Sequence, residues 1–388
     1  MGEWIITDPE ELYKERVERI ETAVELKTPD RVPVICTEMD FSGKYVNISQ
    51  LEYMTNNDKM MMVLEMFYKD FQTDAAYSEP AVFDPLFTVI SEPCIIKVPG
   101  RDLPDDSVFQ LVESEIMKKE DYKHAIRRGY ILTLINLLPK LRPEIPDVQS
   151  KFNEMLQNQV GSELIESNRA KLREWGIPIW HVGGMESPFS VLCLMRSYEK
   201  LVLDIYRNRE LVKETVKKFT QDIIRMSIGG CKSSGINRAQ IGLHRESSSS
   251  FSLKIFEEIA LPMIKEIVDA HIKEDIITIL HCDGDWTPNL PYLTELPKGT
   301  CVIDLDDSTD IYQARDILSD RMCFSGNVME RLLTFGTPQK VEDHCKELID
   351  VLGENGGYIM KGEAPAQAKP ENIKAMIKTA KTYGVYKA

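Results

Sequence analysis

The residues best suited to chemistry follow an apolar segment at positions 276–280. That segment is rich in β-branched residues, and it leads directly into His281, Cys282 and Asp283. Imidazole and carboxylate groups can bind a metal ion or exchange protons near neutral pH. Residues two apart on a strand point to the same side, so we expect His281 and Asp283 to act together. Cys282 should then pack on the opposite face.

Other polar residues follow segments of the same kind. Two of the six histidines lie at such positions: His181 is the second-last residue of the segment 177–182, and His244 comes directly after 236–243. The remaining histidines, His124, His271 and His344, fall in predicted helices. Carboxyl groups also follow such segments: Glu38, Asp40, Glu246, Asp304, Asp306 and Glu363. If these groups gather around one cavity, they will shift one another's pKa values, which suits acid and base catalysis or metal binding.

The segments that precede these residues are predicted to be buried parallel strands, because they are apolar without alternation. There are eight of them, at 31–37, 73–77, 177–182, 236–243, 276–280, 300–303, 322–325 and 357–360. Helical periodicity fills the intervals, as in 58–71, 339–352 and 370–383. Eight strand and helix pairs predict an α/β fold of the (β/α)₈ TIM barrel type, in which the carboxyl ends of the strands carry the chemistry.

Two segments add to this barrel. Residues 8–28 predict an outer N-terminal helix that begins at an Asp-Pro pair. Residues 97–175 predict a helical insertion after the second strand. Because barrels of this class often exceed 250 residues, we expect residues 1–388 to form a single domain.

Composition excludes several kinds of partner. The net charge of −15 argues against nucleic acids, which require clustered cationic residues. The sequence has no run of eighteen apolar residues, so we predict no membrane span. The eight cysteines are widely spaced, so we expect reduced thiols rather than a disulfide framework. The first residues lack a basic and then apolar leader, which predicts a cytoplasmic protein.

Several motifs together carry a family resemblance. They are His281-x-Asp283-Gly284-Asp285, Phe324-Ser325-Gly326-Asn327-Val328, Gly336-Thr337-Pro338, Gly356-Gly357-Tyr358-Ile359 and Pro370-Glu371-Asn372-Ile373. With these motifs the chain resembles the uroporphyrinogen decarboxylase superfamily, over nearly its whole length after residue 30. The resemblance independently implies a (β/α)₈ barrel.

Departures from the family pattern favour one branch. The decarboxylases carry an arginine-rich segment near the first strand that holds porphyrinogen carboxylates, whereas residues 36–45 contain no arginine. The chain is more similar to the corrinoid-dependent methyltransferases. Members that methylate thiols bind zinc through His-x-Cys and a later cysteine. Here the matching positions read His281-x-Asp283 and Lys361-Gly362-Glu363, and carboxylates in place of thiolates argue against thiol activation.

The resemblance implies a methyltransferase I component of an anaerobic O-demethylase system. Such an enzyme moves a methyl group from a phenyl methyl ether to the cobalt(I) of cobalamin on a separate corrinoid protein. The phenolate leaves readily only when it is protonated or bound to a cation. We assign catalysis to His281, Asp283, Glu246 and His244, and candidate zinc ligation to His281, Asp283, Glu246 and Glu363. Substrate binding is assigned to Glu38, Asp40, His181, Tyr45, Asp304 and Trp286.

Other interpretations stay open from the sequence. The same side chains could act without metal, as acids and hydrogen-bond donors. The methyl donor could instead be a methylamine, methanol or a betaine. A decarboxylase or lyase acting on a smaller acid, or a protein that only binds a small molecule, would use similar residues. A homodimer is also left open.

Overall fold

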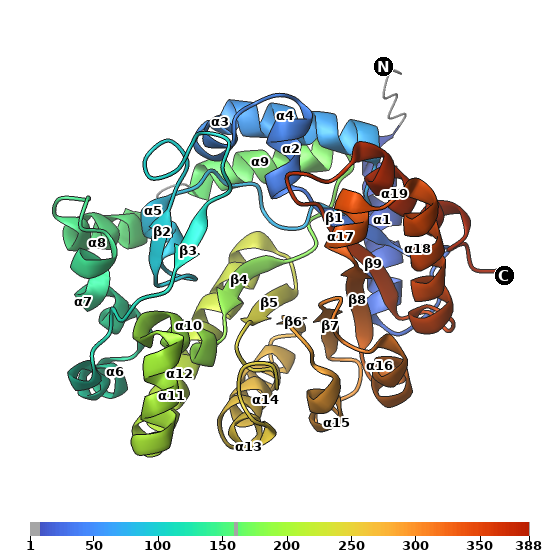
Figure 1. Ribbon diagram of the computed structural model, residues 1–388. Helices are drawn as coiled ribbons and strands as arrows, with labels where there is room; N and C mark the ends of the chain where they lie inside the picture. Colours follow the sequence, from blue (N-terminus) through green and yellow to red (C-terminus); the bar gives the residue numbers. More distant parts are fainter. Residues whose placement is uncertain (1–7, 159–161, 388) are drawn as a thin grey trace. The chain divides into compact units, whose positions relative to one another are not determined.

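The computed structural model describes residues 8–158 and 162–387, which belong to two compact units. Unit 1 comprises Met1–Val82, Leu164–His181 and Gly284–Ala388, and unit 2 comprises Phe83–Glu163 and Val182–Asp283. In each unit, parallel strands alternate with helices (Figure 1). This alternation confirms the predicted α/β class. Across the described residues, every helix is too short or too polar to serve as a membrane span.

Unit 1 contains four parallel strands that pair in the order β1-β9-β8-β7. They are β1 (Val34–Thr37), β7 (Cys301–Leu305), β8 (Cys323–Val328) and β9 (Tyr358–Glu363). Its helices are α1 (Pro9–Val24), α2 (Met39–Tyr45), α3 (Gln50–Thr55), α4 (Asn57–Phe71), most of α9 (Ser162–Glu174), η3 (Thr287–Asn289), α15 (Leu290–Leu293), α16 (Ile311–Leu318), α17 (Glu330–Phe335), α18 (Pro338–Leu352) and α19 (Pro370–Thr382). Strands β7 and β8 are buried along their whole length, as expected for a parallel sheet covered on both faces.

The N-terminal helix confirms the prediction for residues 8–28, with an earlier end. The Asp8 side chain accepts hydrogen bonds from the first backbone N–H groups of α1, and Pro9 occupies its first turn. The helix ends at Val24, and Leu26 adopts a left-handed conformation with φ of 60°.

The prediction of a regular second strand at residues 73–77 is wrong. Residues 73–77 form only isolated bridges, from Ala75 to Ile35 and from Ala76 to Ile179. The reason lies in Asp74, which is buried and ion-paired with Arg19 and Arg31. Its carboxylate also accepts the backbone N–H of Val34, so a side chain takes part in what would otherwise be strand pairing.

Unit 2 contains three parallel strands in the order β4-β5-β6 and a separate antiparallel pair. The strands are β2 (Ile95–Lys97), β3 (Gln110–Val112), β4 (Val182–Glu186), β5 (Arg238–Leu243) and β6 (Ile277–Cys282). Its helices are α5 (Pro85–Thr88), η1 (Lys119–Asp121), α6 (Tyr122–Arg128), α7 (Tyr130–Leu141), α8 (Val148–Asn158), α10 (Pro188–Arg196), α11 (Tyr198–Arg207), α12 (Arg209–Ser234), α13 (Leu253–Ile255), η2 (Phe256–Ala260) and α14 (Leu261–Ile272).

Two predicted boundaries in this region need correction. The insertion at 97–175 is not purely helical, because β3 lies within it and pairs with β2. A turn containing Gly100, with φ of 77°, lies between these two short strands. The strand predicted at 177–182 is shifted, since β4 begins only at Val182.

The eight cysteines are all free thiols, and all are buried. Burial raises the pKa of the thiols of Cys94, Cys193, Cys301 and Cys345 to about 12. These side chains therefore stay protonated and pack as small apolar groups.

Trp286 corrects one substrate-binding assignment. We assigned Trp286 to substrate binding, but the residue is completely buried in unit 1. Its backbone N–H donates to Thr309 Oγ1 at 3.1 Å, which fixes the segment after β6. A fully buried indole belongs to the core and presents no free face to a ligand.

Replacing Trp286 with alanine should therefore cost stability. We expect the free energy of unfolding to fall by about 3–5 kcal/mol, because the truncation leaves a large cavity. Chemical denaturation followed by circular dichroism measures the change. Tyr206→Ala is the control, since Tyr206 is 85% exposed and should change stability by less than about 0.5 kcal/mol. Equal stability of the two variants would contradict the core assignment.

Candidate functional site

Three side chains of kinds that can bind a metal ion meet at the carboxyl ends of β5 and β6 in unit 2. His281 lies in β6, Asp283 follows that strand, and His244 follows β5. Nε2 of His281 lies 3.4 Å from Oδ1 of Asp283, and Nε2 of His244 lies 3.6 Å from Oδ2 of the same carboxylate. One ligand atom from each residue lies within 4.8 Å of the others. Cys282, which lies between His281 and Asp283 in the sequence, is buried.

The donor chemistry of this group fits zinc. Two imidazole nitrogens and one carboxylate oxygen make up the donor set that zinc accepts in catalytic sites, where a fourth position is left for water or substrate. The side chains of His244, His281 and Asp283 are 35%, 18% and 46% exposed, so the group is partly open to solvent. Strands β5 and β6 pair in parallel, and Gly242 of β5 lies opposite His281 of β6. This pairing sets the positions of the two histidines relative to each other.

Glu186 adds a buried carboxyl to this group. It ends β4, and its Oε2 lies 3.0 Å from Nδ1 of His244. Burial raises the pKa of Glu186 well above its ordinary value, and the nearby carboxylates of Glu92, Glu246 and Asp283 raise it further. Glu186 thus approaches His244 at Nδ1, whereas Asp283 approaches the same ring at Nε2.

Glu246 occupies a different environment from the three ligand candidates. Ser190 Oγ lies 3.1 Å from both carboxyl oxygens, the backbone N–H of Arg245 donates to Oε2 at 2.9 Å, and Ser187 also donates to Oε1. Burial raises the pKa of Glu246 to about 7, despite these hydrogen bonds. A carboxyl with this pKa can hold or release a proton at neutral pH, which is the property of a general acid.

Unit 1 carries its own polar residues at the carboxyl ends of its strands. Residues directly opposite in a parallel pair share a face, as do residues two apart on one strand. By this register one face contains Thr37, Asp304, Ser325, Asn327, Lys361 and Glu363, and we call it the polar face of unit 1. Parallel sheets usually bury apolar side chains on both faces, so this face is exceptional.

A buried ammonium group organises the polar face of unit 1. Lys361 Nζ donates to Asp304 Oδ2 at 2.6 Å and to Glu363 Oε1 at 2.9 Å, and it lies 5.2 Å from the centre of the Tyr77 ring. Burial acts to lower the pKa of Lys361, but the two carboxylates outweigh it and hold that pKa well above its usual range. Glu363 is therefore paired with a cation within unit 1.

The remaining predicted substrate-binding residues lie in unit 1. Glu38 is buried beside the Tyr68 hydroxyl, which donates to it at 3.0 Å, and burial raises the pKa of Glu38 to about 7. The ring of His181 packs edge-on against Tyr77, with centroids 4.7 Å apart. Tyr45 stacks on Phe41 and donates to Asp70. Asp40 belongs to α2, and its side chain lies outside the described part of the structure.

Sequence reasoning missed four residues that support the site: Glu186, Ser187, Ser190 and Gly242. Glu186 carried a usable signal, because it is an acidic residue four positions after the apolar segment 177–182. The two serines carried a weaker one, since Ser187 precedes Pro188 as a helix cap does. Nothing in the sequence around Gly242 indicated that the glycine makes room for another side chain.

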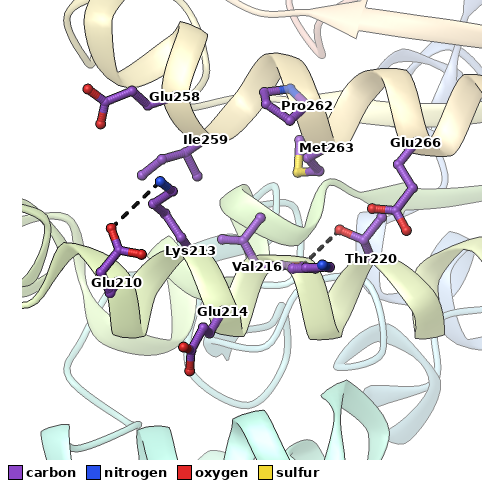
Figure 2. Close-up of a pocket in the computed structure, with 11 residues that line it drawn as sticks. Glu210, Lys213, Glu214, Val216, Thr220, Glu258, Ile259, Pro262, Met263 and Glu266 are labelled. Carbon is purple, nitrogen blue, oxygen red and sulfur yellow. Dashed lines mark hydrogen bonds and ion pairs between the residues drawn. The ribbon is translucent and has the colours of Figure 1, made fainter.

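A surface pocket of about 380 Å³ lies elsewhere in unit 2, between α12 and the η2–α14 segment (Figure 2). Its floor includes Val216, Ile259 and Met263, and its rim is charged. Glu210 contacts Lys213, and Glu258 contacts Arg209. The lining holds four glutamates and two lysines but no histidine, so we do not assign catalysis to this pocket.

The fold and the unit 2 group define an α/β protein of the TIM-barrel type with a histidine and carboxylate centre. A methyltransferase structure from Methanosarcina mazei matches 94% of this chain and 98% of its own, with a TM-score of 0.65 and 17% identity. This likeness confirms the predicted fold. The sequence profile of the uroporphyrinogen decarboxylase (URO-D) family matches residues 153–383, more than half of the chain. The chain belongs to this family.

Curated relatives come from both kinds of protein that the motifs suggested. The methylcobamide:CoM methyltransferase MtbA of Methanosarcina acetivorans is 25% identical over 224 residues, which are 57% of this chain and 63% of that protein. The uroporphyrinogen decarboxylase of Chlorobium luteolum is 24% identical over 266 residues, or 64% of this chain and 72% of the relative. The alignment thus spans somewhat less than two thirds of MtbA. The predicted resemblance to the superfamily and to its methyltransferases is confirmed.

Proposed function

We propose that this chain is a corrinoid-dependent methyltransferase of the O-demethylase type. It would move a methyl group from a phenyl methyl ether to the cobalt(I) of cobalamin on a separate corrinoid protein. The observation that carries the proposal is the group of His244, His281 and Asp283, whose donors are nitrogen and oxygen only. A centre without thiolate favours a harder Lewis acid, which suits an ether oxygen better than a thiol.

The relatives support methyl transfer as the class of reaction. MtbA is named for a methylcobamide substrate, which is a methylated corrinoid. The absence of arginine from residues 36–45 counts against a substrate with several carboxylates, such as a porphyrinogen. We therefore rank methyl transfer above decarboxylation for this chain.

The unit 2 residues would have two different roles, metal binding and proton transfer. His244, His281 and Asp283 would hold a zinc ion, which when bound supplies a positive charge to stabilise a developing phenolate. Glu246, in its protonated form, would give a proton to the departing oxygen. Glu246 is therefore better suited to proton transfer than to the metal ligation first assigned to it, because its oxygens already accept hydrogen bonds.

Unit 1 carries polar groups of its own. We propose that Glu38, His181 and Asp304, together with Lys361 of the polar face, bind polar groups of a small molecule there. The side-chain oxygens of Ser325 and Asn327 on that face are buried, with no hydrogen-bond partner in the described structure. Buried polar atoms normally have partners, so these atoms are suited to bind a ligand or ordered water.

The pH dependence should report Glu246. Because the pKa of its carboxyl is about 7, we expect methyl transfer to slow as pH rises through about 7 and the protonated form is lost. In Glu246→Gln the rate should be lower, and this decline should disappear. Initial rates between pH 5.5 and 8.5 measure it, with Glu92→Gln as the control that keeps the decline. A decline that persists in Glu246→Gln would assign it to another group.

The raised pKa of Glu246 also makes the free energy of unfolding depend on pH. The folded pKa of Glu246 lies above its ordinary value of 4.5, so the folded state binds the proton more tightly. This contribution is fully present below about pH 4.5 and is lost as pH rises through about 7. Glu246→Gln should flatten the fall in unfolding free energy over this window.

The deciding experiment mixes the purified chain with a reduced corrinoid protein and a panel of methyl donors. We expect the cobalt(I) absorbance to disappear with aryl methyl ethers. Conversion with methanol, a methylamine or a betaine but with no aryl ether would reject the O-demethylase assignment. Turnover of a small carboxylic acid by the chain alone, without corrinoid protein, would support the decarboxylase or lyase interpretation instead.

A further inference from the structure

We infer that Glu186 is a positioning residue that orients His244 and fixes which of its nitrogens binds metal. The inference rests on the proposed zinc site and extends it by one residue. Metal-binding histidines usually contact a carboxylate through the second ring nitrogen, which fixes the tautomer and the ring orientation. Nδ1 of His244 lies close to Glu186 Oε2, which is buried and has no hydrogen-bond partner in the described structure.

The two nitrogens of His244 face different carboxyl groups. Nδ1 lies 3.0 Å from Glu186 Oε2, whereas Nε2 lies 3.6 Å from Asp283 Oδ2. Asp283 also approaches His281, so it lies on the ligand side of the imidazole. Glu186 therefore lies beside Nδ1, the ring nitrogen that the proposed zinc site does not use.

Gly242 makes this arrangement sterically feasible. It is opposite Glu186 on β4 and opposite His281 on β6, so it lies between the two residues in the sheet. A Cβ atom at position 242 would lie 2.6 Å from Glu186 Oε1 and 2.8 Å from Oε2. Contacts below 3.0 Å are not tolerated, so any larger residue would displace the carboxyl from its place beside His244.

The burial of Glu186 supports a specific role. Its side chain is only 10% exposed, and burying a carboxyl is costly unless polar groups compensate. The nearby carboxylates of Glu92, Glu246 and Asp283 add to the cost through repulsion. Glu186 Oε2 has no hydrogen-bond partner in the described structure, and a proton on Nδ1 of a zinc-bound His244 would supply one.

The test measures zinc affinity of the full-length protein by competition with a chromophoric chelator. Glu186→Gln and Gly242→Ala should each weaken zinc binding roughly 10- to 100-fold. Glu258→Gln is the matched control, because this unit 2 glutamate contacts Arg209 and does not belong to the group of His244, His281 and Asp283. The control should stay within about threefold of the wild type. Denaturation midpoints, measured alongside, separate loss of affinity from loss of fold.

Nitrogen NMR of the zinc-loaded wild type provides a test that needs no variant. We expect His244 to bind through Nε2 and to carry its proton on Nδ1. Binding through Nδ1, or unchanged affinity in both Glu186→Gln and Gly242→Ala, would overturn the inference while leaving the zinc site intact. If the wild type binds no zinc, both the site and the inference fall.

Discussion

Replacing His281 with alanine should abolish stoichiometric zinc binding and slow methyl transfer by about a thousandfold or more. Two donors, His244 and Asp283, would remain from the group of three. Catalytic zinc normally has three protein ligands, and the charge stabilisation it supplies amounts to several kcal/mol, which corresponds to this rate loss. Metal analysis after dialysis and the cobalt(I) absorbance assay measure the two effects.

His124→Ala is the matched control for this substitution. His124 is also in unit 2, but it lies on α6 and is not part of the group of three. We expect it to retain both zinc and activity. An active, metal-free wild type would reject the ligand role and favour the interpretation in which the same residues act as acids and hydrogen-bond donors.

Replacing Lys361 with methionine should lower the free energy of unfolding by about 3–5 kcal/mol. The side chains of Lys361 and Asp304 are 4% and 1% exposed, so the substitution leaves a buried carboxylate without its cation. Adding Asp304→Leu should recover much of the loss, because an apolar pair can replace a buried ion pair at little cost. Denaturant titration of both variants measures these changes.

Lys298→Met provides the surface comparison. Lys298 also pairs with an aspartate, Asp320, but these side chains are 59% and 71% exposed. Exposed pairs contribute about 0–1 kcal/mol, so this variant should resemble the wild type. If Lys361→Met were as stable as Lys298→Met, the charges of the polar face would have to be solvated in the native protein.

Much of the fold follows from local patterns in the sequence. Apolar runs without alternation predict strands such as β6 and β8, because strands covered on both faces need no polar side. The segment at 73–77 fails this approach. Its second residue, Asp74, pairs with Arg19, a partner 55 positions away that no local pattern reveals.

The candidate site was predictable in part for the same reason. His281 and Asp283 were found because their spacing of two on a strand fixes a common direction. Their contact with His244 depends on the register of β5 and β6, and the role of Gly242 depends on a side chain from a third strand. Trp286 was misassigned because the sequence does not distinguish a ring that stacks on substrate from one that fills the core.

The buried cysteines have a practical consequence for handling the protein. Cobalt(I) is strongly reducing, and keeping a corrinoid in that state requires low-potential reductants. All eight thiols of this chain are free, so no disulfide contributes to its stability. We therefore expect the fold to tolerate the reducing conditions that the proposed reaction demands, without loss of a covalent crosslink.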